Sequence, residues 1–305
     1  MHEELRHLYH DAEVATEAYN TADEQVKKQS KRVAALTEEG HRVQLRLQRL
    51  TAQAGAAARA RYRGGGIPVE VQLMLSGDPG YALDNAAQTV HFQLGVEKLI
   101  QALDTAKNSL HMRAADAANE LKSLEESRMQ RDAARGDIEE RISKARSIEA
   151  RLKAGEKRRL AQLEQRSAAK AQNAWLRSRV VKNLNVKPSS AGGAAVAYAL
   201  RQIGKPYVWG AQGPDSFDCS GLTSQAWAAA GHPIPRTSQE QWRRLPHVRI
   251  EDIRPGDLVI YFEDASHVAM YVGKGSIVQA PRPGRTVTLA PIASMQILGV
   301  VRPDA

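Results

Sequence analysis

Phe217-Asp218-Cys219-Ser220-Gly221-Leu222 is the stretch that holds the only cysteine of this 305-residue chain. One cysteine cannot form an intramolecular disulfide or build a zinc site by itself. It is therefore either an inert buried thiol or a nucleophile that works with a histidine. The residues that follow, 222–230, favour a helix, and Asp218 and Ser220 are suited to its start. Because a helix N-terminus favours the thiolate, we expect a lowered pKa for Cys219.

A candidate histidine lies 48 residues downstream, in the strand-like run 266–273. Most histidines are surface or structural residues, and Val268 and Met270 alternate with His267 as in any strand. Its position at the start of a strand, after the cysteine stretch, favours catalysis. An imidazole can accept the thiol proton and return it to a leaving amine.

Five motifs in the last 115 or so residues resemble, in their order, the NlpC family of papain-like bacterial cell-wall peptidases. The resemblance implies an α+β papain-like domain that needs no metal or cofactor. Short apolar runs at 257–262, 267–272, 276–279 and 298–301 fit its antiparallel strands. The motifs are Gly204-Lys205-Pro206-Tyr207-Val208-Trp209-Gly210, the cysteine stretch 217–222, Ile234-Pro235-Arg236-Thr237-Ser238, Arg254-Pro255-Gly256-Asp257-Leu258 and His267-Val268-Ala269-Met270-Tyr271-Val272-Gly273.

The same resemblance assigns further site residues. It implies Gln279 as the third catalytic group, where family members often have histidine, and an uncharged amide would stabilise the imidazolium less. The alternative for Gln279 is a solvent-facing strand residue, and for Arg236 a surface salt bridge. The implied substrate-binding residues are Tyr207, Asp218, Ser220, Arg236 and Ser238.

The two halves of the chain differ in composition. Residues 186–305 hold eleven of the thirteen prolines and three of the four tryptophans, whereas residues 1–185 are rich in Ala, Glu, Lys, Arg and Gln. We therefore predict a helical domain over 1–185 and a compact mixed domain over 186–305. The net charge of +9 suits a polyanion, but no nucleic-acid motif accompanies it, and 5% aromatic residues is sparse for base stacking.

Apolar residues recur with a seven-residue period over the first part of the chain. The repeat predicts a coiled-coil helix over 2–62, ended by Gly64-Gly65-Gly66-Ile67-Pro68. A second helix is predicted over about 90–181, folded back as the second arm of an antiparallel hairpin. Because that arm is longer, residues 150–182 would overhang toward the catalytic half.

The tip of this hairpin, at about 64–90, contains the consecutive apolar residues Leu73, Met74 and Leu75. They would either cap the hairpin or dock a partner. The layout resembles coiled-coil cell-wall hydrolases of the Rip and PcsB types, which the FtsEX-type transporter controls. The resemblance implies that Leu73, Met74 and Leu75 contact such a transporter.

These observations predict a cysteine endopeptidase that cleaves the γ-D-glutamyl–diamino acid bond of peptidoglycan stem peptides, with the coiled coil covering its site. The bond follows from the resemblance alone. A non-catalytic activator of another hydrolase, and an acyltransferase or amidase on the same fold, are the alternatives. The sequence contains no run of 18 apolar residues, so we expect no membrane span. The polar start, Met1–Leu8, is not a signal sequence and by itself indicates a cytoplasmic protein, whereas the resemblance implies export. We therefore expect a mature or truncated form of an exported protein.

Overall fold

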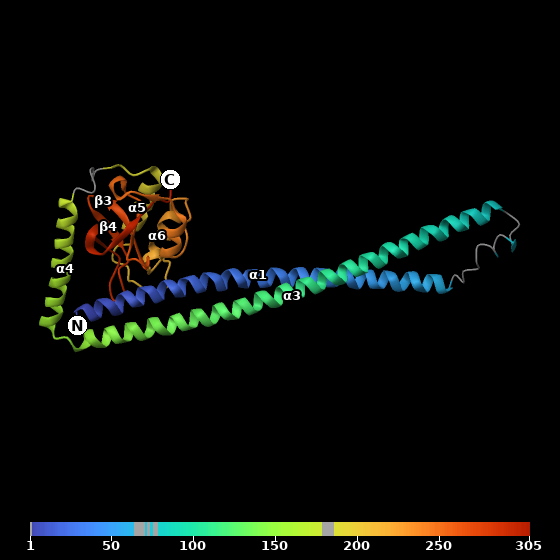
Figure 1. The fold of residues 1–305 in the computed structure, drawn as a ribbon, viewed down its shortest axis with the longest axis horizontal. Coiled ribbons are helices and arrows are strands. Elements are labelled where there is room, and N and C mark those ends of the chain that lie inside the picture. Colours follow the sequence, from blue (N-terminus) through green and yellow to red (C-terminus); the bar gives the residue numbers. More distant parts are fainter. Residues whose placement is uncertain (1, 64–70, 72–73, 76–78, 179–185) are drawn as a thin grey trace. The chain divides into compact units, whose positions relative to one another are not determined.

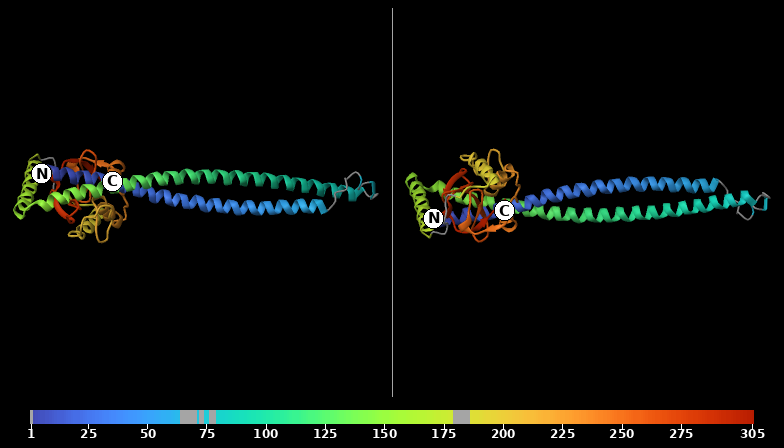
Figure 2. Two further views of the ribbon diagram at one scale, coloured as in Figure 1. Left: turned by 90° about the horizontal axis from the view of Figure 1, so that it is seen from below. Right: turned by 90° about the horizontal axis from the view of Figure 1, so that it is seen from above.

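The computed structural model describes residues 2–63, 71, 74–75, 79–178 and 186–305 (Figures 1 and 2). Its contacts divide the chain into two compact units. Unit 1 comprises Met1–Gln25 and Ser127–Ala305, and unit 2 comprises Val26–Glu126. The division into domains at residue 185 remains a prediction based on composition.

Two long helices run through both units, α1 (His2–Arg63) and α3 (Pro79–Arg151). The bounds of α1 agree with the predicted helix over 2–62. Its first turn carries Glu3 and Glu4, and its last turn carries Arg61 and Arg63, as the helix dipole favours.

The second arm is not one helix, so the prediction of a continuous helix over 90–181 is wrong. The chain is extended at Lys153, with φ −67° and ψ 159°, and a new helix, α4, spans Ala154–Arg177. Its start is fixed because the Glu156 carboxylate accepts a hydrogen bond from the backbone N–H of Lys153 at 2.8 Å. The arm is therefore divided into two shorter pieces.

Helices α1 and α3 pair in antiparallel fashion within each unit. In unit 1, Arg141 of α3 donates to Asp11 of α1 at 2.7 Å. In unit 2, Arg113 of α3 lies 2.9 Å from Glu39 of α1. The seam in unit 1 is apolar, and its buried members include two clusters, one of Ala12, Ala15, Ile138 and Ile142 and one of Leu5, Tyr9 and Ala145.

The C-terminal part of unit 1 combines three helices with one antiparallel sheet of order β1-β6-β2-β3-β4-β5. The predicted strands are present, whereas α7, β1 and β5 were not anticipated. The helices are α5 (Ser190–Leu200), α6 (Cys219–Ala229) and α7 (Ser238–Arg244). The strands are β1 (His247–Val248), β2 (Leu258–Tyr261), β3 (His267–Gly273), β4 (Ser276–Gln279), β5 (Thr288–Pro291) and β6 (Ile297–Val301), and short 3-10 turns lie at Ile250–Asp252 and Ile292–Ser294.

The sheet is covered on both faces. Helices α5 and α6 pack on one face of the sheet (Figure 1). There Leu222 and Trp227 of α6 belong to the same apolar cluster as Ile260 and Met270. On the other face, Trp175 of α4 joins a second apolar cluster. Because α6 lies directly against β3, the start of this helix and the start of this strand are held next to one another.

We expect Gly221→Ala to destabilise unit 1, although alanine is the better helix former. A Cβ atom at Gly221 would lie 2.2 Å from the carbonyl oxygen of Ala211, so backbone must move. Such overpacking costs about 1–3 kcal/mol. The midpoint of thermal unfolding, followed by near-UV circular dichroism of the tryptophans, should fall by several degrees.

Gly136→Ala in α3 is the matched control, since a Cβ atom there meets nothing within 4 Å. It should raise stability by up to about 1 kcal/mol. A Gly221→Ala protein that melts at or above the wild-type temperature would show that the Ala211 contact does not restrict this position.

Candidate active site

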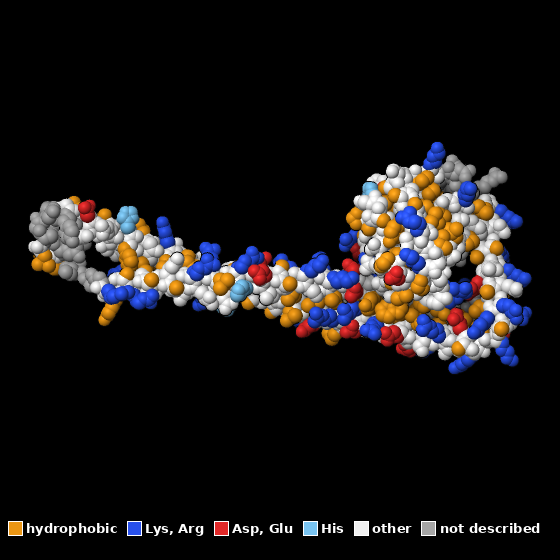
Figure 3. All heavy atoms as spheres, turned by 180° about the vertical axis from the view of Figure 1, so that it is seen from behind, with side chains coloured by type: hydrophobic (Ala, Val, Ile, Leu, Met, Phe, Trp, Pro, Cys, Tyr) orange, Lys and Arg blue, Asp and Glu red, His pale blue; other side chains and the backbone are white. Residues whose placement is uncertain are grey.

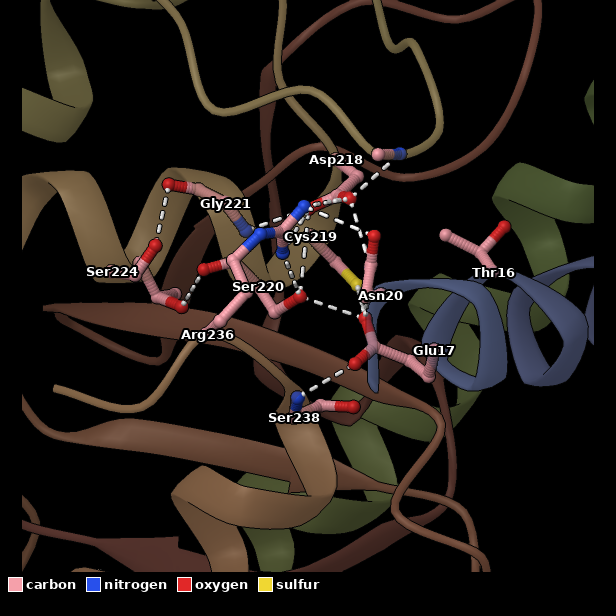
Figure 4. A network of polar contacts seen from close by, with 12 residues as sticks. Thr16, Glu17, Asn20, Asp218, Cys219, Ser220, Gly221, Ser224, Arg236 and Ser238 are labelled. Atoms are coloured by element: carbon pink, nitrogen blue, oxygen red, sulfur yellow. Dashed lines mark hydrogen bonds and ion pairs between the residues drawn. The ribbon is translucent and has the colours of Figure 1, made fainter. Parts of the chain in front are cut away.

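The cysteine occupies the first position of α6, and the residue before it caps the helix. The Asp218 carboxylate accepts a hydrogen bond from the backbone N–H of Gly221 at 2.6 Å. The Cys219 side chain is 2% exposed, and it lies within the network of polar contacts drawn in Figure 4. The predicted helix start is therefore present, but solvent does not reach the thiol.

A buried ion pair lies beside the cysteine. Arg236 donates to both carboxylate oxygens of Asp218, at 3.1 Å and 2.6 Å. The side chains are 8% and 0% exposed, so Arg236 is not in a surface salt bridge. It also donates to the Ser220 hydroxyl at 2.8 Å, which joins three of the predicted substrate-binding residues in one network.

The histidine and the glutamine meet as the resemblance implied. His267 begins β3 and Gln279 ends β4, and the imidazole Nε2 lies 2.8 Å from the Gln279 Oε1. An amide oxygen only accepts, so Nε2 carries the proton and Nδ1 is free to accept one. Gln279 is 7% exposed, which excludes a solvent-facing position. The neighbouring residue Val268 makes a backbone hydrogen bond with Cys219, so the thiol lies at the start of β3.

One face of α1 covers this site. Its residues Glu13, Thr16, Glu17 and Asn20 follow the spacing of neighbours on one helix face. The Glu17 Oε1 accepts a hydrogen bond from the Ser220 hydroxyl at 2.7 Å and lies 3.6 Å from the Cys219 Sγ. Its Oε2 accepts from the backbone N–H of Ser238 at 2.9 Å (Figure 4).

The other three residues of this face complete the cover. Asn20 donates to Asp218 at 3.1 Å and accepts from Arg236 at 3.2 Å. Thr16 forms a hydrogen bond with the Tyr207 hydroxyl. The Glu13 carboxylate lies 3.8 Å from Nδ1 of His267. Of the predicted catalytic and substrate-binding residues, only Gln279 has no such contact with α1.

The segment expected to cover Cys219 is residues 150–182, and its described part, residues 150–178, lies elsewhere. Most of it is α4, which packs beside the turn between β3 and β4. Gln172 of α4 donates to the carbonyl oxygen of Gly275 at 3.0 Å. The covering element is therefore the first helix and not the overhang of the second.

The electrostatics of the covered site oppose ionisation of the thiol. Burial raises the pKa of Cys219 well above its usual value, and the carboxylates of Glu17, Asp218 and Glu13 raise it further. Burial also lowers the pKa of His267 to about 4, although the Gln279 hydrogen bond acts in the opposite direction. The expected low thiol pKa is thus absent, because burial and nearby negative charge outweigh the helix N-terminus. Thiol and imidazole are both neutral near pH 7.

The covering face could not be found from the sequence. Polar residues on a helix normally face solvent, and Glu13, Thr16, Glu17 and Asn20 lie outside the apolar seam. The only local signal is that threonine and asparagine are poor helix formers within a long helix.

The remaining predictions concern the tip, metals and membranes. Met74 and Leu75 are exposed, at 86% and 74%, while Leu73 lies outside the described residues. Within the described ranges, no cluster of three His, Cys, Asp or Glu residues could hold a metal ion. No helix among the residues that the structure describes is long and apolar enough to cross a bilayer.

A helix that presents a cysteine at its first residue, packed on an antiparallel sheet that presents a histidine, is the papain-like fold. Residues 204–297 match the model of the NlpC/P60 family. Three similar proteins illustrate the range of the match.

A probable endopeptidase of Corynebacterium glutamicum is 46% identical over 94 residues, which are 30% of this chain and 45% of that protein. A probable endopeptidase of Mycobacterium tuberculosis is 40% identical over 112 residues, or 36% of this chain and 29% of that protein. The solved NlpC/p60 domain of the peptidoglycan hydrolase SagA is 32% identical, with a TM-score of 0.34, and the match covers 36% of this chain and 97% of that domain. The chain thus spans less than half the length of the two endopeptidases.

The contact between the covering face of α1 and the catalytic residues should become less stable as pH rises. Burial raises the pKa of Glu17 from its ordinary 4.5 to about 7, and raises that of Glu13 as well. At these two carboxyl groups the covered state therefore binds more protons than the uncovered one. Their contribution to its stability is fully present below about pH 4.5 and is lost as pH rises through about 7. The lowered pKa of His267 acts in the opposite direction, between its value of about 4 in the covered state and its ordinary 6.5.

Hydrogen–deuterium exchange of residues 9–22 and 207–218, corrected for intrinsic rates, measures this effect. Protection at pH 5.5 should exceed that at pH 8. In the Glu13→Gln/Glu17→Gln protein the difference should shrink, since amides do not titrate. Equal protection at both pH values in the wild type, or an unchanged difference in the double variant, would contradict the assignment.

Proposed function

We propose that this protein is a cysteine endopeptidase that cleaves the γ-D-glutamyl–diamino acid bond of peptidoglycan stem peptides, and that α1 holds it inactive. The observation that carries the proposal is a cysteine at a helix start beside a histidine whose ring is held by Gln279. The match of residues 204–297 to the NlpC/P60 family, and the relatives described as probable endopeptidases, support it.

The chemistry follows from the atoms of the site. Nδ1 of His267 accepts the thiol proton, and the Cys219 sulfur attacks the amide carbonyl carbon. The imidazolium then returns the proton to the leaving amine, and a thioester remains on Cys219. Water, activated by the same ring, hydrolyses the thioester. Gln279 keeps Nε2 protonated and so keeps Nδ1 facing the reaction.

Helix α1 prevents this reaction by occupying the place of the substrate. The resemblance assigns Ser220 and Ser238 to peptide binding, and both donate hydrogen bonds to Glu17. The Glu17 carboxylate also lies against the sulfur that must attack. A peptide can reach Cys219 only after α1 has moved.

The setting of the enzyme follows from its substrate. Peptidoglycan lies outside the cytoplasmic membrane, so the protein acts as an exported enzyme in the cell wall during division. The exposed Met74 and Leu75 support docking of the tip to the extracellular part of an FtsEX-type transporter. Binding there would favour the uncovered state.

We expect Glu17→Lys to activate the full-length protein. The change removes the hydrogen bonds to Ser220 and Ser238 and introduces a cation in the neighbourhood of Arg236. Turnover of a soluble stem peptide should rise at least tenfold in kcat/KM, and alkylation of Cys219 by iodoacetamide should accelerate with it.

Glu3→Lys is the matched control, because it makes the same charge change on an exposed part of the same helix, where Glu3 lies 3.8 Å from Arg6. It should leave both rates at the wild-type level. A wild-type protein that already turns over the peptide as fast as Glu17→Lys would refute inhibition by α1, while leaving the endopeptidase assignment in place.

The activity itself is best tested in the activated protein. Digestion of purified peptidoglycan by Glu17→Lys, followed by mass spectrometry of the muropeptides, should show cleavage after γ-D-glutamate. Glu17→Lys/Cys219→Ala should retain less than about 1% of this activity. Because Cys219→Ala removes a single small atom, circular dichroism should be unchanged.

Other products would identify the alternatives. Transfer of the glutamyl group to an added amine, in place of hydrolysis, would indicate an acyltransferase. Absence of any change in peptidoglycan, together with rapid alkylation of Cys219, would indicate a non-catalytic activator. Cleavage that survives loss of the thiol would refute the nucleophile.

A further inference from the structure

The positive charge of unit 2 is concentrated in the residues that are farthest in sequence from unit 1. We call residues 40–63 of α1 and 79–111 of α3 the basic arm. It carries six arginines and two lysines against three carboxylates, a net charge of +5. The connecting segment adds Glu70 and Asp78, so residues 40–111 sum to +3. The rest of unit 2, residues 26–39 and 112–126, has six basic and six acidic residues and is neutral.

All six of these arginines belong to α1, which has no acidic residue after Glu39. Arg42, Arg46 and Arg49 are spaced by four and three positions, so they share one helix face. Together with Leu45, Leu50 and Gln53 they line a shallow surface hollow of about 480 Å³. Figure 3 shows Lys and Arg side chains, with few Asp or Glu, along this part of the long helices.

These arginines have almost no counter-charge in the protein. Arg42 reaches Glu38 only at 4.0 Å. For Arg46, Arg49, Arg59, Arg61 and Arg63, the described residues provide no ion pair within the same distance, and all five are exposed. In the neutral part of unit 2, by contrast, Arg113 lies 2.9 Å from Glu39. The arginines of the basic arm are therefore available to bind an external anion.

Apolar side chains accompany the charges. Tyr62 is 90% exposed between Arg61 and Arg63, and Leu45, which lines the hollow, is 40% exposed. At the start of α3, Leu83 is 71% exposed. Arginine side chains together with exposed aromatic and aliphatic side chains on helices suit the boundary between the headgroups and the acyl chains of a lipid bilayer.

We propose that the basic arm binds the surface of an anionic phospholipid bilayer, with Arg42, Arg46 and Arg49 on headgroup phosphates. The distribution of charge favours a bilayer over an acidic protein. The arginines extend over 22 residues of α1, about 33 Å at 1.5 Å per residue, and Arg61 projects in a different direction from Arg59 and Arg63. A broad, deformable layer of phosphates can contact all of them. The inference is independent of catalysis, and it is compatible with docking of the tip to a membrane transporter.

Co-sedimentation of the full-length protein with vesicles tests the inference. The probes are vesicles of 30% phosphatidylglycerol in phosphatidylcholine, and pure phosphatidylcholine vesicles, in about 50 mM salt. The protein should bind the anionic vesicles and not the neutral ones, and binding should weaken as salt rises. Arg42→Gln/Arg46→Gln/Arg49→Gln should lower the affinity roughly fivefold per arginine, on the order of 100-fold in all.

Lys28→Gln/Lys31→Gln/Arg32→Gln is the control, because it removes three exposed charges from the neutral part of the same helix. It should retain wild-type binding to within a few fold. The proposal is overturned if wild type ignores the anionic vesicles, or if both triple variants lose binding equally. Displacement from the vesicles by an equal concentration of polyphosphate charge would also overturn it, since the arm would then recognise phosphate chains in place of a bilayer. The helical circular dichroism of both variants verifies that they are folded.

Discussion

The state of the active site depends on one buried carboxylate, that of Glu17. Removing an ion from water costs several kcal/mol, and here the Ser220 hydroxyl and the Ser238 N–H offset that cost. Arg236 contributes its charge from the same network. The contact that fixes α1 also places negative charge against the Cys219 sulfur. Attachment of the helix and suppression of the thiolate are therefore two effects of a single interaction.

The surfaces that separate on opening are largely polar. Glu13, Thr16, Glu17 and Asn20 would exchange protein partners for water, and no large apolar surface would be exposed with them. The aromatic contacts that would be lost are the edge contacts of Tyr19 with Trp209 and of His10 with Phe262, and the packing of Arg282 over the Tyr9 ring. A covered state held in this way differs from the uncovered one by a modest free energy, so a partner or a change in pH can shift the population.

The sequence predicts those parts of the structure that are encoded in short segments. The helix start at Cys219, the strand that begins at His267 and the long α1 each have a local pattern of residue types. The helix break at Lys153 could not be predicted because that residue is neither proline nor glycine. Strand β5 lies at the edge of the sheet and ends in Pro291, and the proline weakens the sequence pattern of a strand. Contact between Glu17 and Ser238 joins residues 221 positions apart, and no local periodicity records it. The sequence therefore predicts the catalytic residues Cys219, His267 and Gln279, but not the face of α1 that covers them.

Over residues 12–20, helix α1 makes contacts on two sides, with α3 and with the catalytic residues. Ala12 and Ala15 pack in the seam with α3, while Glu13, Thr16, Glu17 and Asn20 lie on the catalytic residues, and only Val14 and Ala18 are exposed. Elsewhere a coiled coil accepts many exchanges at its outward positions. In this segment almost every exchange alters either the helix pair or the cover. Among related chains with the same architecture, residues 12–20 should therefore diverge as slowly as an enzyme's own catalytic motifs, within a helix that otherwise diverges freely.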